Sequence, residues 1–288
     1  MGSTGTGKSR LAVALAKQYN GEIVNSDVMQ LYKGLAVTTN KMTDEEREGV
    51  PHHLMDFVEP DFDFTEFDFC HHASLAIEKI HSEGKLPIVA GGSNYFIDTL
   101  VNNYNNGEFK RKYRCCFLWV DVDTSVLDFF VSDRVDKMVR AGLVEEARGM
   151  YDPHTHDYSI GMRQSIGVRE LDLYFRAEEA ANDECDRRAL AKLLADGIEE
   201  IKENTRLLTR EQLKKIHRLY GMWGSQIMHR IDSSEVFMHL QHGKLMESYQ
   251  AWVRLVMEPS SKIVRQFLDQ EVVQFRPPRP TWSRKLCS

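Results

Sequence analysis

Short runs of hydrophobic residues alternate with longer amphipathic stretches along the first half of the chain. The runs at 21–25, 86–90 and 116–122 have the length and the residue types of buried strands. Apolar residues at helical spacing predict helices at 8–19, 65–81, 95–101, 127–138 and 144–151. Because short strands separated by helices are typical of a parallel sheet, we expect an α/β fold with helices on both faces of that sheet.

Turn and breaker residues separate these elements. Pro51 and Pro60 predict that residues 43–60 are mostly loop, and the polar residues at 102–112 predict a second loop. Gly84 is expected to end the helix that begins after Thr65. These breaks keep the predicted helices short enough to be the connections of an α/β fold.

The second half of the chain is predicted to be mostly helical. The stretch 177–220 is charged and proline-free and predicts a long helical region, and 245–269 predicts a pair of helices. Between them, 229–232 predicts a last short strand. We therefore expect one domain over residues 1–275, with a disordered tail over 276–288.

Composition narrows the classes of partner. The chain has 288 residues, of which 42% are hydrophobic and 28% charged, with a formal net charge of −6. An acidic balance disfavours a polynucleotide partner, and no apolar run approaches the roughly 18 residues of a membrane span. We expect no nucleic acid and no membrane as partners, and no targeting segment is visible.

The five cysteines do not predict a disulfide framework or a zinc site. Their number is odd and no two of them are spaced as C-x-x-C. The adjacent residues His52 and His53 lack the further ligands at fixed spacing that a zinc site needs, so we interpret them as polar packing groups. The sequence is therefore typical of a reducing compartment.

The most specific motif lies at the start of the chain. Residues 2–9 fit the phosphate-binding pattern G-x-x-x-x-G-K-[ST], and the helix predicted from residue 8 follows directly. The backbone N–H groups of such a loop bind phosphate oxygens, the lysine adds a charge, and the last hydroxyl can ligate Mg²⁺. The residues expected to bind phosphate are Gly2, Thr4, Gly5, Thr6, Gly7, Lys8 and Ser9, with Ser9 also a metal ligand. A buried strand normally precedes this loop, and we expect that first sheet strand to be absent from this chain.

Asp27 follows the predicted strand 21–25. Ligands of open α/β sheets bind beyond the carboxyl ends of the strands, so Asp27 is expected near the phosphate loop. An aspartate at this place is also a common helix N-cap or turn residue. The pattern alone leaves both interpretations open.

Further motifs give the chain a resemblance to the isopentenyltransferase family, whose members transfer a dimethylallyl group to the N6 amine of adenine. The residues that carry the resemblance are 2–9, 25–27 with Gln30 and Tyr32-Lys33, 38–41, 49–53, 91–93, 117–121, 134–136, 165–168, 202–205 and 259–264. They occur in order over nearly the whole chain. The resemblance implies a fold like that of the P-loop NTPases, with a parallel sheet flanked by helices and a C-terminal helical region.

The resemblance is greatest to the branch that acts on free adenine nucleotides. The tRNA-modifying branch carries a long helical insertion before the strand at Phe117, and here only about fifteen residues, 101–115, fill that gap. The run 115–122 is similar to the plant adenylate isopentenyltransferases, which make cytokinin precursors. The expected donor is dimethylallyl diphosphate, and the expected acceptor is ATP or ADP, with AMP as an alternative acceptor. The expected cofactor is Mg²⁺.

The family's functional residues imply roles for matching positions here. Asp27 would be the general base that takes the proton from N6, and Arg163 and Lys215 would hold phosphates of the donor or the acceptor. The residues implied for the adenine and prenyl pocket are Ser26, Gln30, Thr38, Thr39, Asn40, Gly92 and Ser93. Without the resemblance, Lys215 would be interpreted as part of a solvated helix face, because basic residues recur every four positions around it. Two positions depart from the family pattern, Gln164 and Glu211, where relatives often carry basic residues.

The resemblance also implies an enzyme that is a monomer in the plastid or the cytoplasm. Three alternatives stay open from the sequence. The first is a tRNA dimethylallyltransferase without its insertion, and the second is a small-molecule kinase with the same phosphate loop. The third is a nucleotide-binding protein without catalytic activity.

Overall fold

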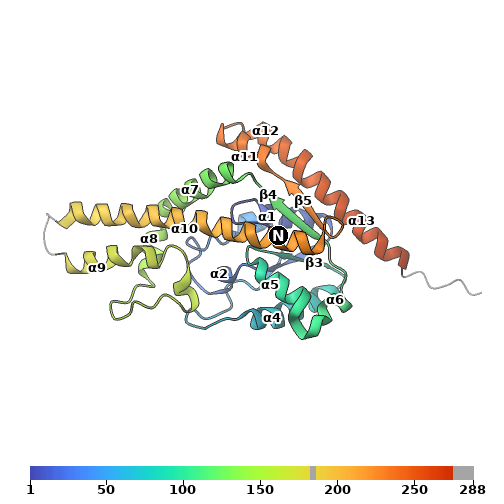
Figure 1. The fold of residues 1–288 in the computed structure, drawn as a ribbon, viewed down its shortest axis with the longest axis horizontal. Helices are drawn as coiled ribbons and strands as arrows, with labels where there is room; N and C mark the ends of the chain where they lie inside the picture. Colours follow the sequence, from blue (N-terminus) through green and yellow to red (C-terminus); the bar gives the residue numbers. More distant parts are fainter. Residues whose placement is uncertain (182–185, 275–288) are drawn as a thin grey trace, which may run out of the picture.

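The computed structural model describes residues 1–181 and 186–274, and its strands are all parallel (Figure 1). The strands of the described residues are β1 Gly21–Asn25, β2 His52–His53, β3 Leu86–Ala90, β4 Phe117–Asp121 and β5 Met228–Asp232. Three of them lie in the order β2-β1-β3, and β4 pairs with β5. The predicted parallel sheet is therefore confirmed, and so are the four predicted strands at 21–25, 86–90, 116–122 and 229–232.

The sheet is divided between β3 and β4, since no strand of the described residues pairs with both. Met1 lies along the free edge of β4, where its amino group donates to the Leu118 carbonyl at 2.7 Å and its carbonyl accepts from the Val120 N–H at 3.0 Å. Figure 1 shows the N-terminus close to β4. The phosphate motif thus starts at the division in the sheet.

Helices surround these strands, and most of the second half of the chain is helical (Figure 1). The helices before β4 are α1 Lys8–Gln18, α2 Val28–Leu31, α3 Asp44–Arg47, α4 Glu66–Ser82, α5 Asn94–Asp98 and α6 Glu108–Lys112. Those after it are α7 Thr124–Arg140, α8 Leu143–Arg148, α9 Asp172–Ala180, α10 Asp186–Trp223, α11 Ser234–Gln241, α12 Leu245–Trp252 and α13 Glu258–Gln274. A π-helical turn follows α5 at Thr99–Asn103 and another follows α12 at Val253–Met257.

Local chemistry explains why the predicted helices begin and end where they do. Thr65 caps α4 in a reciprocal pair with Asp68, each side chain bonding the other's backbone N–H. At the other end of α4, Gly84 has a φ of +72°, which favours glycine. Asn20, also in the left-handed region, separates α1 from β1. The predictions for 8–19, 65–81, 127–138 and 144–151 are confirmed with small shifts at the ends.

One predicted loop was wrong, and two other predicted segments differ from the structure only in detail. Residues 102–112 are not a loop, because Phe109 buries its ring and contacts Tyr113, which stabilises α6. The stretch 177–220 is helical as predicted over its described residues, except at Ala181, which is extended and follows the end of α9. Residues 43–60 are mostly loop as predicted, with the single turn α3 and the short strand β2 among them. The predicted tail at 276–288 lies outside the described residues.

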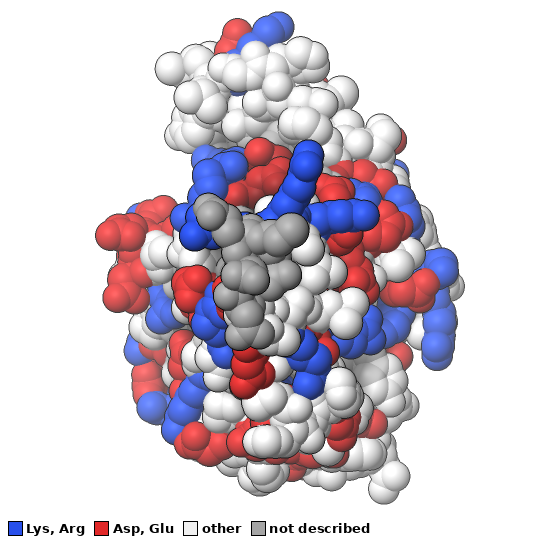
Figure 2. Space-filling view, turned by 90° about the vertical axis from the view of Figure 1, so that its left-hand side faces the viewer, with Lys and Arg blue, Asp and Glu red and all other residues white. Residues whose placement is uncertain are grey.

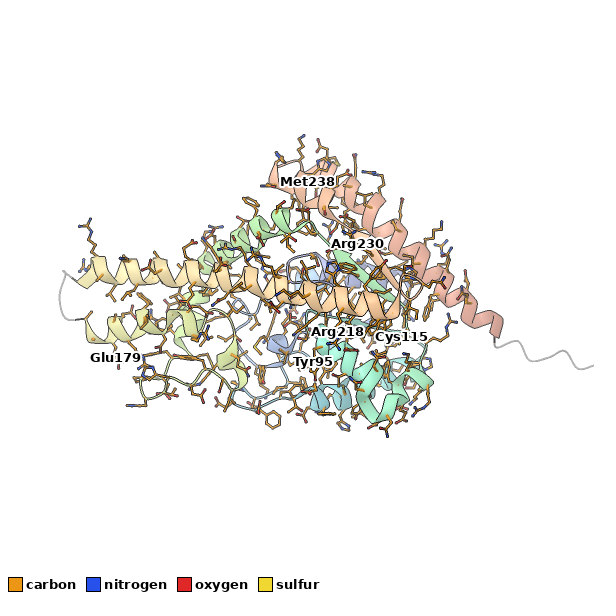
Figure 3. The ribbon with its side chains drawn as sticks, viewed as in Figure 1. Tyr95, Cys115, Glu179, Arg218, Arg230 and Met238 are labelled. Atoms are coloured by element: carbon orange, nitrogen blue, oxygen red, sulfur yellow. The ribbon has the colours of Figure 1, made fainter. Side chains whose placement is uncertain are left out.

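Helix α11 was not predicted from the sequence. It has few apolar residues facing inward, of which Val236 is buried and Phe237 packs beside Phe130 at 5.0 Å between ring centroids. Helices α11 and α12 pack against each other at one edge of the molecule. Figure 3 shows Met238 at that edge and Arg230 on β5, whose guanidinium bonds Asp121 on β4 at 2.7 Å.

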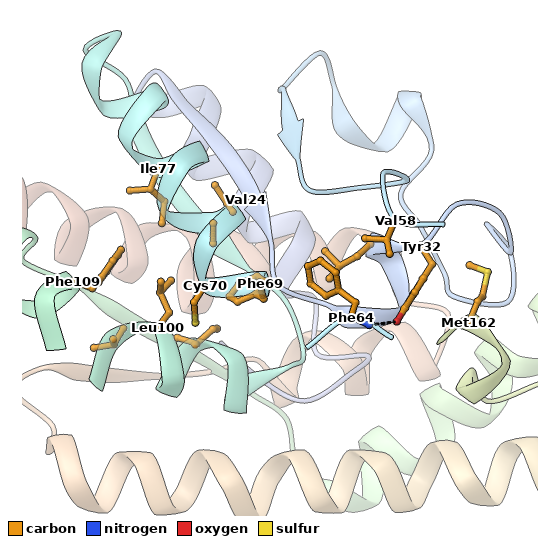
Figure 4. Close-up of a cluster of buried hydrophobic side chains, with 14 of the residues drawn as sticks. Val24, Tyr32, Val58, Phe64, Phe69, Cys70, Ile77, Leu100, Phe109 and Met162 are labelled. Atoms are coloured by element: carbon orange, nitrogen blue, oxygen red, sulfur yellow. Dashed lines mark hydrogen bonds between the residues drawn. The ribbon is translucent and has the colours of Figure 1, made fainter. Parts of the chain in front are cut away.

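The largest hydrophobic core lies between α4, β1, β3 and the loop that follows α2 (Figure 4). Phe69 and Cys70 are fully buried in it. Tyr32 is also buried, and its hydroxyl donates to the Phe62 carbonyl at 3.0 Å and accepts from the Phe64 N–H at 3.3 Å. This core fixes the segment that leaves the end of β1, where Asp27 lies.

The longest helix, α10, crosses the molecule and continues beyond it. Its second half contains the fully buried residues Thr209 and Ile216, whereas the described residues from 187 to 196 include none that is buried. That first part packs against α9, and both helices project from the body of the molecule in Figure 1. On the face shown in Figure 2, acidic and basic side chains are intermixed rather than separated by sign. Among the described residues, no helix has the length and apolar character needed to cross a bilayer.

Candidate active site

The phosphate motif folds into a tight loop at the start of α1. Gly5 has a φ of +85°, and a side chain there would also meet Val131 at 2.9 Å, so only glycine fits. The Lys8 ammonium donates to the Ser3 carbonyl at 2.7 Å, and the Thr6 hydroxyl donates to the same carbonyl at 3.0 Å. These bonds curl the loop around the first turn of α1, which is the arrangement that directs backbone N–H groups toward an anion.

Asp27 lies at the carboxyl end of β1, one residue after the fully buried Ser26. It occupies the N-cap position of α2, and the backbone N–H of Met29, in the first turn of that helix, acts to lower the pKa of its carboxyl group. Burial raises the pKa of this carboxyl group, and the charges of Lys8 and Arg134 oppose that shift. The turn interpretation is therefore correct for the backbone, while the carboxylate itself lies near two cations.

The two cations near Asp27 are half-buried. Burial lowers the pKa of Lys8 to about 8, while Asp27 raises it and Arg134 lowers it further. Burial also lowers the pKa of Arg134, and Asp27 opposes this shift. Arg134 reaches the phosphate loop directly, because its Nη2 donates to the Thr4 hydroxyl at 3.0 Å. A carboxylate and two cations therefore meet beside the loop.

The turn after β3 forms the wall next to Asp27. A side chain at Gly91 would lie 2.5 Å from the Asp27 nitrogen, and one at Gly92 would lie 3.4 Å from the Asp27 Oδ2. Ser93 ties this turn to the same segment, since its N–H donates to the Ser26 carbonyl at 3.0 Å and its hydroxyl accepts from the Val28 N–H at 3.1 Å. Three of the predicted pocket residues, Ser26, Gly92 and Ser93, are thus brought together around Asp27.

The predicted pocket residues at 38–40 are held in different ways. Gln30 donates through Nε2 to the carbonyls of Thr39 and Asn40, both at 3.1 Å, which draws that loop toward the start of α2. Thr38 is buried, and both its N–H and its hydroxyl donate to the Glu146 carboxylate. The hydrogen-bonding groups of Thr38 are therefore engaged within the protein, whereas the Asn40 side chain is exposed and makes no hydrogen bond with the described residues.

Arg163 lines a separate recess of about 250 Å³ together with Tyr158, Arg169 and Asn204. Its Nη2 lies 3.7 Å from the Asp152 carboxylate, so it is only loosely paired. The recess adjoins the Asp27 segment, because the Ser165 hydroxyl lies 3.1 Å from the Met29 sulfur. An anionic group of a ligand bound near Asp27 would find a cation at this recess.

Lys215 is exposed on α10. It lies one turn after Gln212, and residues three apart occupy the same helix face. Gln212 reaches both the phosphate loop and the turn after β3, as its Oε1 accepts from the Thr4 N–H at 2.7 Å and its Nε2 donates to the Gly92 carbonyl at 3.0 Å. This places Lys215 on the side of α10 that faces the site.

Arg134 and Gln212 are the site residues that the sequence reasoning missed. Each is a polar residue on the buried face of its helix. Arg134 is three residues after the buried Val131, and Gln212 is four residues before the buried Ile216. A long polar side chain on an apolar stripe was the available signal, although it does not identify the partner.

The residues around the loop are compatible with Mg²⁺ held mainly by a bound diphosphate. Ser9 is exposed in the first turn of α1, and its hydroxyl makes no hydrogen bond with any described residue. In the part of the chain that the structure describes, no three His, Cys, Asp or Glu side chains form a metal cluster. Since Mg²⁺ binds through phosphate oxygens, waters and one or two protein oxygens, the Ser9 hydroxyl fits as a ligand.

Proteins of known family resemble this chain over most of its length. A family model described as IPP transferase matches residues 30–111 and 102–219. Adenylate isopentenyltransferase 5, chloroplastic, of Arabidopsis thaliana is 50% identical over 269 residues, which are 93% of this chain and 78% of the relative. Adenylate isopentenyltransferase 7, mitochondrial, of the same plant is 47% identical over 268 residues, again 93% and 78% of the two chains.

Solved structures show the same fold. A eukaryotic dimethylallyltransferase acting on tRNA superposes with a TM-score of 0.76 and 25% identity, over 93% of this chain and 78% of that one. The resemblance predicted from the sequence is thereby confirmed. The chain belongs to the IPP transferase family.

Proposed function

We propose that this protein transfers the dimethylallyl group of dimethylallyl diphosphate to the N6 amine of a free adenine nucleotide. The product would be an N6-dimethylallyl adenine nucleotide, a cytokinin precursor. The observation that carries the proposal is the position of the Asp27 carboxylate, which is half-buried and electrostatically coupled to Lys8 of the phosphate loop. Identities of 46–50% to proteins named adenylate isopentenyltransferase support the same function.

In the proposed reaction, the C1–O bond of the donor breaks and the C1–N6 bond forms. The diphosphate leaves with the electron pair of the broken bond, and one N6 proton passes to Asp27. N6 is a weak nucleophile because its lone pair is delocalised into the ring, so a base on the N–H is needed as the bond forms. A positioned general base contributes about 10²–10⁴ in rate.

The phosphate loop would bind the leaving diphosphate. The backbone N–H groups of residues 5–9 and the Lys8 ammonium would stabilise its developing charge, and Arg134 adds a second cation at Thr4. Mg²⁺, with Ser9 as its protein ligand, would supply further neutralisation of that charge. Removing one preorganised donor of this kind costs about 3–4 kcal/mol in transition-state stabilisation.

The acceptor would lie with its adenine ring beside Asp27. We assign the ring's surroundings to Ser26, Gly92, Ser93 and the loop at 38–40, which Gln30 holds in place. Arg163 and Lys215 would then bind the acceptor's phosphates, Arg163 from the recess and Lys215 from α10. ATP and ADP are the acceptors we favour, because two separated cations suit a polyphosphate better than AMP.

The test is incubation with dimethylallyl diphosphate, Mg²⁺ and a mixture of ATP, ADP and AMP, followed by mass spectrometry of the products. The expected product is a nucleotide heavier by one dimethylallyl group less one hydrogen. Asp27→Ala should lower the rate by about 10²–10⁴ while leaving the fold intact by circular dichroism. No prenylated nucleotide from the unaltered protein would overturn the proposal.

A second candidate function is the modification of tRNA, because the superposed structure acts on tRNA. The short segment between β3 and β4 and the intermixed charges in Figure 2 favour the free nucleotide instead. A parallel incubation with tRNA separates the two, since labelled tRNA would reverse the assignment. Transfer of a γ-phosphate to an acceptor without prenyl transfer would point to a kinase.

We also propose that the protein is a monomer with one transferase domain over residues 1–275 and works in the plastid or the cytoplasm. The names of two relatives include the words chloroplastic and mitochondrial. Size-exclusion chromatography with light scattering tests the monomer, and a fluorescent fusion of the chain's full-length gene product tests the compartment.

A further inference from the structure

Within the described residues, Gln212 is the one side chain of α10 that hydrogen-bonds both walls of the candidate active site. Its amide oxygen accepts from the Thr4 N–H in the phosphate loop, at 2.7 Å, and its amide nitrogen donates to the Gly92 carbonyl after β3, at 3.0 Å. Thr4 and Gly92 are far apart in the sequence and belong to different turns. A single amide group therefore joins them.

The two turns carry the two parts of the proposed reaction. Thr4 belongs to the loop that would bind the leaving diphosphate, and Gly92 packs on the residue that would take the proton. A carbon added at Gly92 would lie 2.6 Å from the Gln212 Nε2 and 3.4 Å from the Asp27 Oδ2, so the amide lies next to the carboxylate. The two hydrogen bonds of Gln212 thus link the loop that would bind the diphosphate to the turn beside Asp27.

The bond from Thr4 does not compete with the diphosphate. Thr4 lies before the residues at 5–9 whose N–H groups would receive the phosphate oxygens, and its hydroxyl is already bonded to Arg134. Gln212 also lies on a helix that is anchored by the buried residues Thr209 and Ile216 on either side of it. The Gln212 side chain consequently links two turns from a well-anchored part of α10.

We propose that Gln212 is a positioning residue, which holds the phosphate loop and the Asp27 wall at the separation that the transfer reaction requires. This inference rests on the proposed function. Glutamine suits the role because one end of its amide accepts and the other donates. Glutamate would keep the acceptor for Thr4 but present a second acceptor to the Gly92 carbonyl, and leucine would provide neither bond.

The test compares Gln212→Leu and Gln212→Glu with Gln241→Leu, a matched control on α11, where the glutamine is exposed and makes no hydrogen bond with the described residues. For each protein we would measure kcat, KM for both substrates, and the Kd of dimethylallyl diphosphate without acceptor. Because a misplacement of about 1 Å can lower the rate about 10²-fold, we expect kcat to fall by that order in both Gln212 variants. The donor Kd should change by less than about threefold, and Gln241→Leu should match the unaltered protein.

A purely structural role would give a different result. It would lower the thermal midpoint and weaken donor binding together with kcat, and such a parallel loss in both Gln212 variants would overturn the inference. An unchanged kcat in Gln212→Leu would overturn it as well. If the unaltered protein forms no prenylated nucleotide, the proposed function fails, and this outcome is distinct from a variant that keeps full activity.

Discussion

Gly91→Ala is expected to damage both the fold and the site, because Gly91 packs directly on the segment that carries Asp27. The added carbon would lie 2.2 Å from the Ser26 carbonyl carbon and 2.5 Å from the Asp27 nitrogen. Carbon atoms in contact normally lie about 3.5–4.0 Å apart, so the backbone has to move by about 1 Å. The movement would strain the bonds that the Ser26 N–H makes to Ala90 and that Ser93 makes to Ser26, at 2.9 and 3.0 Å.

The magnitude follows from two contributions. Overpacking costs about 1–3 kcal/mol, and each weakened hydrogen bond adds about 1 kcal/mol. We therefore expect the free energy of unfolding to fall by about 3–5 kcal/mol, which lowers Tm by about 10 °C for a chain of this size. A displacement of about 1 Å at Asp27 should also lower kcat by about 10²-fold.

The assay is urea denaturation together with prenyl transfer at a temperature well below the Tm of the variant. Gly221→Ala is the matched control, because Gly221 lies in α10 with no atom within 4 Å of the added carbon. That variant should gain up to about 1 kcal/mol from helix propensity and keep its kcat. If Gly91→Ala is as stable and as active as Gly221→Ala, the reasoning about the Asp27 wall is refuted.

Three further predictions concern pH and stability. With subsaturating donor, kcat/KM should rise as Asp27 loses its proton, at a pH above the ordinary aspartate pKa of 3.8, and should fall near pH 8 as the Lys8 ammonium loses a proton. Lys8→Arg should remove the fall at alkaline pH. A fall that stays near pH 8 in this variant would contradict its assignment to Lys8. Tyr32→Phe should lower the free energy of unfolding by about 1–2 kcal/mol in urea titrations, because it leaves a buried N–H without an acceptor, and no loss would argue against that bond. Glu22 bonds Lys85 and His53, which lower its pKa, so its stabilisation is present above its unfolded pKa and is lost as the pH falls through the folded one. Glu22→Gln should cost about 2 kcal/mol at pH 7 by thermal unfolding, and a cost that persists below pH 3 would refute the ionic origin.

The strands were predictable because each is a short apolar run bounded by polar or turn residues. β1 and β3 have the predicted bounds, and β4 differs from its prediction by one residue at each end. The parallel pairing of the strands was predictable, because helices connect them, but the order of the strands in the sheet was not. The division between β3 and β4 is a property of the three-dimensional arrangement that hydrophobic patterns do not describe.

The elements that sequence reasoning missed are stabilised by distant contacts. Helix α6 depends on Phe109 and Tyr113 packing on the main core, and α11 depends on α7 and α12. The α6 segment is mostly polar in the sequence, and the α11 segment has only eight residues, so tertiary packing decided their structure. The same applies to the break after Ala180, where no proline or glycine marks the end of α9.

The sequence predicted the phosphate loop and Asp27 of the candidate site, but it did not predict the two side chains that contact them, Arg134 and Gln212. The phosphate loop and Asp27 follow from motif and topology, and both lie where the carboxyl end of β1 meets the start of α1. Arg134 and Gln212 come from helices far along the chain, and only their place on a buried helix face was visible in the sequence. Pairing a side chain with a loop some two hundred residues away requires the fold.

The uneven burial of α10 has a consequence for its dynamics. At about 1.5 Å per residue, this helix of 38 residues is about 57 Å long, yet its buried residues are confined to the part from Gly197 onward. Backbone amides of the projecting part should therefore exchange with deuterium through local opening, while those around Thr209 should exchange only when the whole protein unfolds. Local opening of the projecting part of α10 would therefore leave the buried contacts around Thr209 and Ile216, beside the candidate site, in place.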